Sequence, residues 1–367
     1  MGNASFWWRN LADAPRTSRL GSIPTPDVKG EHWAFFEADV LPLMKRLIGD
    51  RAPSEIQQYL FQRLSNADRF RSSQLLYALL ADADVAHTEG AAHAAASVEF
   101  LQLARLIVDD VVDEHVLRWD TPTLRTQHDD KKAILTSHLL TALSGLCAVE
   151  SERCSSPRTH GLTPEPEAAA SVADHTRMIT QGMQAELNFR QKGISRENYE
   201  TISARKHCNG SFCVSLAGRL STELFATHAA ELRKAMRNSD LAAAVSNDYS
   251  EVHGIRGIDV ARRPDGERRG RYTEIQMGRP TIFHVYLTSD ERLRHNRGHD
   301  SLVMHELKSV SVSEMPRLLQ SIGALDYAER QRERYRAEAA RALPEDLGRT
   351  KAWVTRAAVI HESPEGN

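Results

Sequence analysis

Residues 89–116 read EGAAHAAASVEFLQLARLIVDDVVDEHV, an Ala-rich stretch with no proline and no glycine in its interior. Such a run predicts one long helix. More segments with helical period flank it along the chain, and we find neither the alternating pattern of a strand nor a repeat of fixed length. The sequence therefore predicts an all-α fold, a large single-domain helical bundle.

The 367 residues are enough for one large domain with a sizeable core. Residues 1–35 are rich in proline, glycine, serine and polar residues, and we expect them to form an extended N-terminal arm. The helical domain is expected over residues 36–355, followed by a tail over 356–367. Residues 255–278 hold four glycines and many arginines, which predicts a loop within the domain.

Composition limits the classes of partner. A formal net charge of -2 and a pI near 6.8 give no electrostatic reason to expect nucleic acid or an anionic membrane. No apolar run approaches the ~20 residues that a transmembrane helix needs, and the N-terminus lacks the pattern of a secretion signal. The four cysteines show neither CxxC spacing nor the density of a disulfide scaffold, so a reduced, cytoplasmic setting is expected.

Three aspartates, Asp109, Asp110 and Asp113, lie among apolar residues at the end of the long helical pattern. Burying an unpaired carboxylate is costly, so such a cluster needs a positive partner. At helical spacing Asp109 and Asp113 share one face, with Asp110 beside them. Carboxylates one turn apart can hold Mg²⁺. The motif alone leaves open a solvated helix end with acidic residues clustered by chance.

A second cluster, Asn247, Asp248 and Glu251, repeats the same spacing at the end of another apolar helical pattern. Amide and carboxylate oxygens are again hard ligands suited to Mg²⁺. Two such helix ends facing each other would form a cage for metal ions that bridge an oligophosphate. Lys206 and Arg118 could neutralise further charge.

Several motifs, which follow one another along the chain in the family's order, resemble those of the trans-isoprenyl diphosphate synthases over roughly residues 40–350. DDVVD resembles the first aspartate-rich motif, and RWDTPT after it resembles Arg-Arg-Gly-x-Pro-Thr. NDYSE resembles the second aspartate-rich motif, and GRPT the Gly-Lys-Pro-Thr that follows it. GMQAEL resembles Gly-Gln-x-x-Asp-Leu, with Met183 for Gln and Glu186 for Asp, and ARKHC keeps the family's lysine as Lys206.

The resemblance implies an isoprenoid-synthase fold and an enzyme that ionises an allylic isoprenoid diphosphate. Three Mg²⁺ ions would bind the diphosphate between the two motifs and stabilise it as a leaving group. The metal ligands implied are Asp109, Asp113, Asn247, Asp248, Glu251 and Glu186. The catalytic residues implied are Asp109, Asp110, Asp113, Arg118 and Lys206. A homodimer is also implied.

The resemblance further implies a set of substrate-binding residues: Arg118, Lys206, Arg271, Gln102, Ala104, Trp119 and Arg71. Arg271, or Arg269 near it, would take the place of a diphosphate-binding lysine. Ala104, five residues before Asp109, stands near a position where the family blocks its tail pocket with a bulky aromatic, which favours a tail of C15 to C20 or longer. We expect Arg105, beside it, to turn outward.

The chain departs from the family at the cradle for isopentenyl diphosphate, which the resemblance places at NADRFRSS, residues 66–73. Asp68 stands where the family has lysine, and Trp119 replaces the second arginine of its Arg-Arg pair, while Arg69 and Arg71 remain. A unit charge ~4 Å from a phosphate is worth roughly 4 kcal/mol at an effective dielectric near 20. We infer that the affinity for isopentenyl diphosphate is weak or absent, unless Arg69 shifts by one position to fill the gap.

A cation made without that partner has two fates, cyclisation as in a terpene synthase or transfer to an acceptor other than isopentenyl diphosphate. The indole of Trp119 suits either fate, by cation–π attraction or by stacking, although ordinary packing also explains it. Two alternatives stay open. One is a chain-elongating polyprenyl diphosphate synthase, and the other is a non-catalytic regulatory subunit of a heteromeric synthase, against which the two intact motifs argue.

Overall fold

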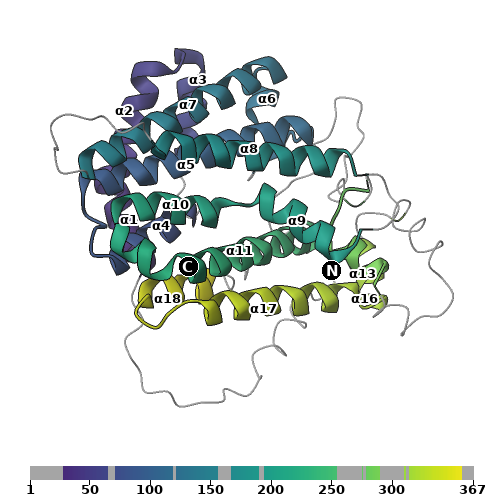
Figure 1. The fold of residues 1–367 in the computed structure, drawn as a ribbon. Coiled ribbons are helices and arrows are strands. Elements are labelled where there is room, and N and C mark those ends of the chain that lie inside the picture. The colour runs from purple at the N-terminus through teal and green to yellow at the C-terminus, as the bar shows by residue number, and fades with distance from the viewer. Residues whose placement is uncertain are drawn as a thin grey trace.

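The fold is all-α, as the sequence predicts. The structure, a computed structural model, describes residues 28–64, 71–118, 121–155, 167–189, 194–253, 278–289 and 314–357, with Ile275 and Val310 as single residues. Among these residues the only strands are β1 (Leu117–Arg118) and β2 (Thr121–Pro122), which pair antiparallel. In Figure 1 the helices stack in rows from α3 (Ser54–Leu64) and α7 (Asp130–Ser155) at the top, through α8 (Glu167–Leu187), to α17 (Ala324–Ala342) and α18 (Gly348–Ala357) at the bottom.

The helices of the first half of the chain are α1 (Val28–Phe35), the π-helical turn η2 (Phe36–Val40), α2 (Leu41–Arg51), α3 (Ser54–Leu64), α4 (Arg71–Asp82), α5 (Glu89–Val112), α6 (Leu124–Gln127) and α7 (Asp130–Ser155). Those of the second half are α8 (Glu167–Leu187), α9 (Arg196–Lys206), α10 (Asn209–Leu220), α11 (Thr222–His253), α13 (Ile282–Leu287), α16 (Met315–Ser321), α17 (Ala324–Ala342) and α18 (Gly348–Ala357).

Helix α5 is the predicted long helix, and local chemistry fixes both its ends. Thr88 caps the first turn by accepting a hydrogen bond from the Ala91 amide. The helix ends at Val112, and two residues later Glu114 adopts a left-handed φ of 53°. That conformation reverses the chain, so β1 runs back beside the end of α5.

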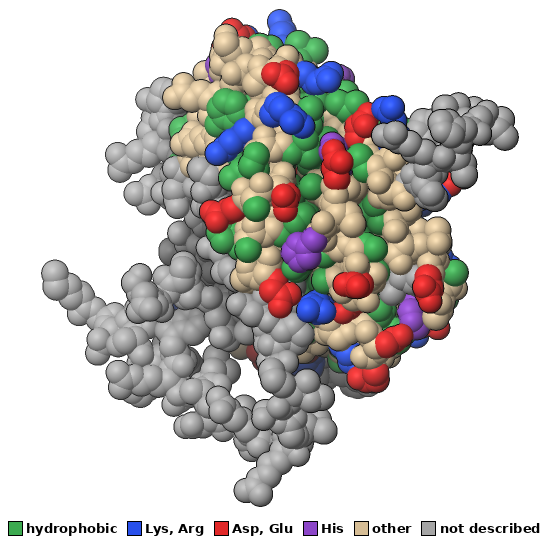
Figure 2. Space-filling model, turned by 90° about the vertical axis from the view of Figure 1, so that its left-hand side faces the viewer, with side chains coloured by type: hydrophobic (Ala, Val, Ile, Leu, Met, Phe, Trp, Pro, Cys, Tyr) green, Lys and Arg blue, Asp and Glu red, His purple; other side chains and the backbone are tan. Residues whose placement is uncertain are grey.

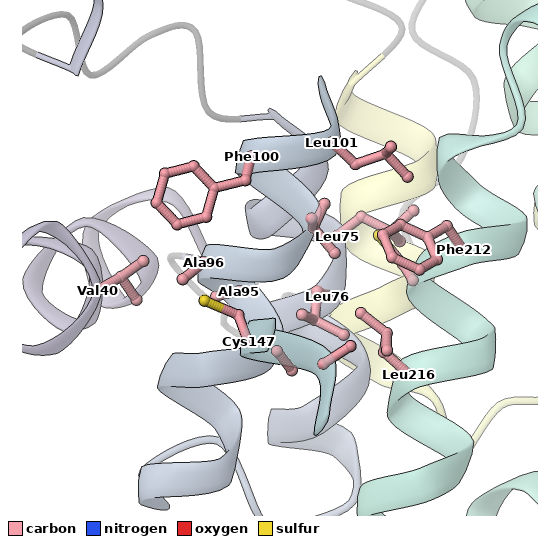
Figure 3. Packing of buried hydrophobic residues seen from close by; sticks show 14 of the residues in the cluster. Val40, Leu75, Leu76, Ala95, Ala96, Phe100, Leu101, Cys147, Phe212 and Leu216 are labelled. Atoms are coloured by element: carbon pink, nitrogen blue, oxygen red, sulfur yellow. The ribbon is translucent and has the colours of Figure 1, made fainter. Parts of the chain in front are cut away.

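Two apolar clusters hold the bundle together. The larger one joins η2, α4, α5, α7 and α10, and Figure 3 shows Phe100 of α5 and Phe212 of α10 among its side chains. The smaller one joins α9, the end of α11, α13 and α17. By length and composition α5 and α7 could each span a membrane, but they pack along each other here, and 72% of the apolar window of α5 is buried.

Two expectations need correction. The N-terminal arm was expected to reach residue 35, but α1 begins at Val28, and Phe35 and the following Phe36 are buried in the core. Residues 1–27 lie outside the described residues. The side chain of Arg105 was expected to turn outward; it is partly buried and donates a hydrogen bond to Gln102. Ala104, by contrast, is buried in the larger apolar cluster.

The face drawn in Figure 2 carries acidic, basic and apolar side chains interspersed. On the described part of that face, Lys and Arg side chains lie mostly in the upper part of the view, and Asp and Glu side chains are most frequent in the lower part.

Candidate active site

Arg118 bridges two of the aspartates at the end of α5. Its Nε donates to Asp110 Oδ1 at 2.6 Å, and its Nη2 donates to Asp109 Oδ2 at 3.0 Å. Asp110 is only 2% exposed, so its charge needs this partner. The carboxylates also lie at the negative end of the helix dipole, which makes a nearby cation more favourable. The turn at Glu114 is what brings β1, and therefore Arg118, to this helix end.

Hydrogen bonds from Arg63 and Thr123 hold the hairpin that carries Arg118 in place. Arg63 of α3 donates to the carbonyl oxygens of Arg118 and Pro122, both at 3.0 Å. Thr123 Oγ1 donates to the His115 carbonyl at 2.8 Å. These bonds fix the backbone on both sides of β1, so Arg118 is held in position rather than left as a mobile surface arginine.

Lys206, the last residue of α9, is the second cation. Its Nζ lies 3.0 and 2.8 Å from the two carboxylate oxygens of Glu186 and 3.5 Å from Asp109 Oδ1. The Lys206 and Glu186 side chains are each 7% exposed. Gly182 lets α8 approach this closely, because a Cβ there would lie 2.6 Å from the Lys206 amide nitrogen. The glycine of the GMQAEL motif therefore has a packing role.

These cations control the ionisation of Asp109. Burial alone would raise the pKa of Asp109, but the charges of Lys206, Arg118 and Arg105 outweigh it and hold that pKa well below its usual range. Asp109 therefore stays a carboxylate at any physiological pH. The same attraction, from Asp110 and Asp109, overcomes the burial of Arg118 and raises its pKa.

The second acidic cluster lies at the end of α11. Asp248 is 7% exposed, and its Oδ2 accepts hydrogen bonds from the Tyr199 hydroxyl at 2.8 Å and the Ile282 amide at 2.7 Å. Burial and the nearby Asp248 charge raise the pKa of Tyr199 well above its usual value, so it remains a donor. Asn247 is partly exposed on the same helix. The side chain of Glu251 lies outside the described residues.

The segment 278–282 touches both acidic clusters. The Arg279 guanidinium forms an ion pair through Nη1 with Asp113 Oδ1, and its Nη2 donates to the Val112 carbonyl at 3.3 Å. Three residues later the Ile282 amide bonds Asp248. One short segment therefore ties the end of α5 to the end of α11. This places the two predicted motifs at the same end of the bundle.

The residues present fit a hard divalent cation. The donors are carboxylate oxygens, which Mg²⁺ prefers. Among the described residues, Asp110 Oδ2 and Asp113 Oδ2 are buried and make no hydrogen bond. Buried carboxylate oxygens without partners are rare and point to a missing ion or ligand. The cations Arg118, Lys206 and Arg279 lie around the same carboxylates and could bind an oligophosphate with the metal.

The structure thus brings together Asp109, Asp110, Asp113, Arg118, Lys206 and Glu186, with Gln102 and Arg105 farther back along α5. Arg71 begins α4, although nothing is described of its side chain, and Asp68, Trp119 and Arg271 lie outside the described residues. Two contributors were not assigned from the sequence, Arg279 and Tyr199. The GRPT motif contained a signal for Arg279, since a cation there matches the family's lysine. Tyr199 had no signal in the sequence.

An all-helical bundle with two acidic helix ends joined beside buried cations defines a protein of the isoprenoid-synthase class. The polyprenyl synthetase family model matches residues 53–290, well over half of the chain, and the chain belongs to that family. No curated protein sequence matches it.

Solved structures of similar fold cover nearly the whole chain. A polyprenyl synthase from Caulobacter crescentus CB15, complexed with calcium and isoprenyl diphosphate, has 20% identity and a TM-score of 0.69 and covers 94% of this chain and 99% of its own. A decaprenyl diphosphate synthase from Rhodobacter capsulatus has 16% identity and a TM-score of 0.68, over 91% and 98%. A heptaprenyl diphosphate synthase from Staphylococcus aureus has 16% identity and a TM-score of 0.67, over 92% and 98%. At these identities the likeness concerns the fold.

Proposed function

We propose that this protein ionises an allylic isoprenoid diphosphate and releases diphosphate, with the organic cation either cyclised or transferred to an acceptor other than isopentenyl diphosphate. The observation that carries the proposal is the cluster in which Arg118, Lys206 and Arg279 contact three carboxylates of one helix end, Asp109, Asp110 and Asp113. Cations fixed this way are positioned to stabilise charge that develops on a departing diphosphate.

We propose Mg²⁺ as the cofactor, with three ions held by Asp109, Asp113, Asn247, Asp248, Glu251 and Glu186. When bound, the metal neutralises the diphosphate and makes it a better leaving group. The buried oxygens of Asp110 and Asp113 without hydrogen bonds support a cation at this place. The chain itself contributes orientation: Tyr199 and the Ile282 amide hold Asp248, and Arg118 holds Asp109 and Asp110.

Charge neutralisation by the protein continues after the bond breaks. The C1–O bond of the substrate breaks with its electron pair on the diphosphate oxygen, so negative charge on the leaving group rises. Lys206, Arg118 and Arg279 are already desolvated, and their attraction is therefore stronger than in water. Their release from the carboxylates when metal and diphosphate bind would leave them free to contact the leaving group.

Chain elongation with isopentenyl diphosphate is the second function considered, because similar solved structures include a decaprenyl and a heptaprenyl diphosphate synthase. Asp68 and Trp119, in place of a lysine and an arginine, argue against it. A purely regulatory subunit is disfavoured by the ion pairs that hold the first acidic cluster and by the hydrogen bonds that hold Asp248 of the second. The proposal for the allylic chain, C15 to C20 or longer, rests on the resemblance at Ala104, which is buried in the core.

The test is an incubation of the purified protein with C10, C15 and C20 allylic diphosphates, each with and without isopentenyl diphosphate, in Mg²⁺. We expect diphosphate release that does not depend on isopentenyl diphosphate, with products identified by mass spectrometry. A protein that releases no diphosphate from any of the three would contradict the proposed function.

We also propose a homodimer that forms through α7 and α8. Ile134 and Leu135 of α7 are 41% and 66% exposed, and Leu187 at the end of α8 is 46% exposed. Between the two helices lies a groove of about 590 Å³ with a mainly apolar lining that includes Gly145 and Val172. A second copy would cover this surface. The free state of all four cysteines is compatible with the cytoplasmic setting that we propose.

A further inference from the structure

Arg105 lies on α5 four residues before Asp109, so the two side chains leave the helix on the same side, one turn apart. Its Nε donates to Gln102 Oε1 at 3.1 Å. The same oxygen accepts a hydrogen bond from Asn209 Nδ2, in the first turn of α10, at 2.9 Å. All three residues are partly buried. Gln102 therefore links α5 to α10 and holds the guanidinium of Arg105 in place.

The guanidinium of Arg105 has fewer hydrogen-bond acceptors around it than it has donors. It has five N–H donors, and among the described residues only its Nε makes a hydrogen bond and no carboxylate lies within ion-pair distance. The nearby carboxylates have other partners, since Asp109 contacts Lys206 and Arg118, and Asp240 Oδ1 accepts the Gly210 amide at 3.0 Å. The terminal nitrogens of Arg105 are therefore available to a ligand.

A hydrocarbon tail is a poor neighbour for this group. It would remove water from the guanidinium without replacing the lost hydrogen bonds. An allylic cation would also be repelled by the charge of Arg105. The ligand that suits it is an oxyanion, because a planar guanidinium matches a carboxylate in a two-point contact.

The number of cations argues for a carboxylate rather than a second diphosphate. The diphosphate site around Asp109 offers three cations, Arg118, Lys206 and Arg279. Around Gln102 the described residues offer one cation, the guanidinium of Arg105, together with the neutral side-chain amides of Gln102 and Asn209. A single positive charge balances a monoanion and leaves a diphosphate largely uncompensated.

We propose that Arg105, held by Gln102 and Asn209, binds the carboxylate of the molecule that captures the allylic cation. This inference rests on the proposed function and names its acceptor as a carboxylic acid with an electron-rich unsaturated or aromatic group. In the transfer, the C1–O bond of the allylic diphosphate breaks with its electron pair on the diphosphate. A bond forms between C1 and an electron-rich atom of the acceptor, and the proton displaced from that atom goes to the released diphosphate.

The test uses benzoate as the probe and methyl benzoate as its uncharged match. Binding to the full-length protein is measured by calorimetry in Mg²⁺ and inorganic diphosphate, for the wild type, Arg105→Met and Arg105→Lys. Arg105→Met preserves the length of the side chain and removes its charge. We expect benzoate to bind the wild type, methyl benzoate to bind at least tenfold more weakly, and Arg105→Met to lose at least tenfold in benzoate affinity. Arg105→Lys should recover part of that loss.

The matched control is Arg153→Met, an exposed arginine of α7 paired with Glu150, which should bind benzoate like the wild type. Equal binding of benzoate to the wild type and Arg105→Met, equal binding of the ester, or no benzoate binding at about 10 mM would each overturn the inference. The diphosphate-release assay with C10, C15 and C20 allylic diphosphates is run on the same variants. If Arg105→Met changed only the chain length consumed in that assay, the inference would also be overturned, because Arg105 would then line the tail channel. Diphosphate release is assayed separately, so its absence contradicts only the proposed function.

Discussion

Lys206 Nζ lies 2.8 Å from Glu186 Oε2, and both side chains are nearly excluded from solvent. The two residues are 20 positions apart on different helices, and Gly182 makes their approach possible. A buried pair of this kind contributes little net stability over an apolar pair, yet breaking it leaves one charge without a partner. This asymmetry makes the pair a useful probe of the site.

We expect Lys206→Met to lower the free energy of unfolding by about 3 kcal/mol, because Glu186 would remain buried without a cation. The double variant Lys206→Met plus Glu186→Gln should regain part of that loss, since neither charge remains. Urea denaturation followed by circular dichroism measures both. A double variant no more stable than the single one would show that the two side chains are not coupled.

Asp109→Ala should reduce the rate of diphosphate release by about 100-fold or more while the helical circular-dichroism signal stays nearly unchanged. Asp113→Ala should also lose activity, but with a drop in stability, because Arg279 would lose its buried partner. Asp174→Ala, on the exposed face of α8, is the control and should keep full activity. Full activity of Asp109→Ala would remove the metal-site interpretation.

Tyr199→Phe should raise the Mg²⁺ concentration needed for half-maximal activity by about 10- to 100-fold, since Asp248 would lose a hydrogen bond that orients it. Activity is measured against Mg²⁺ at saturating allylic diphosphate. Tyr77→Phe removes another tyrosine hydroxyl, one that contacts His87 rather than a residue of either acidic cluster, and should leave the Mg²⁺ dependence unchanged. If both variants match the wild type, Asp248 does not depend on Tyr199.

Glu99 gives a pH dependence of stability. Burial raises its pKa from 4.5 to about 7 although its Oε1 accepts the Ser73 amide. Because the folded pKa lies above the unfolded one, the folded state prefers the protonated form. The contribution of Glu99 to stability is therefore lost as the pH rises from about 4.5 to 7. The full loss corresponds to about 3 kcal/mol.

Glu99→Gln should remove that dependence, so its stability should exceed that of the wild type more at pH 8 than at pH 5, measured by urea denaturation. The difference between the two proteins isolates Glu99 from His32. Burial lowers the pKa of His32 to about 3, so His32 destabilises the fold as the pH falls below 6.5. A constant difference across this range would mean that Glu99 titrates normally.

The wild-type protein should not elongate prenyl chains efficiently, because Asp68 and Trp119 replace two cations that would hold isopentenyl diphosphate. The double variant Asp68→Lys plus Trp119→Arg should raise the affinity for isopentenyl diphosphate, to the extent that packing around residue 119 allows. Incorporation of labelled isopentenyl diphosphate measures both. Elongation by the wild type at about 1 s⁻¹ or faster would show that the cradle is rebuilt elsewhere.

Much of this protein could be predicted from local patterns. The period of the apolar residues determined an all-helical bundle, since helix formation depends on residues three and four apart. The spacing of Asp109 and Asp113 determined that the two carboxylates share one helix face. The order of the motifs indicated the polyprenyl synthetase family, which the family model confirms.

The tertiary structure alone decided which residues meet. Arg279 and Val112 are 167 positions apart, and Tyr199 and Asp248 are 49 apart, so no local pattern relates them. The direction of Arg105 was predicted wrongly because its charge alone favours solvent, whereas the bond to Gln102 and the Asn209 contact from α10 hold it partly buried beside the site. A side chain's neighbours depend on how helices pack, and helix packing is a property of the whole chain.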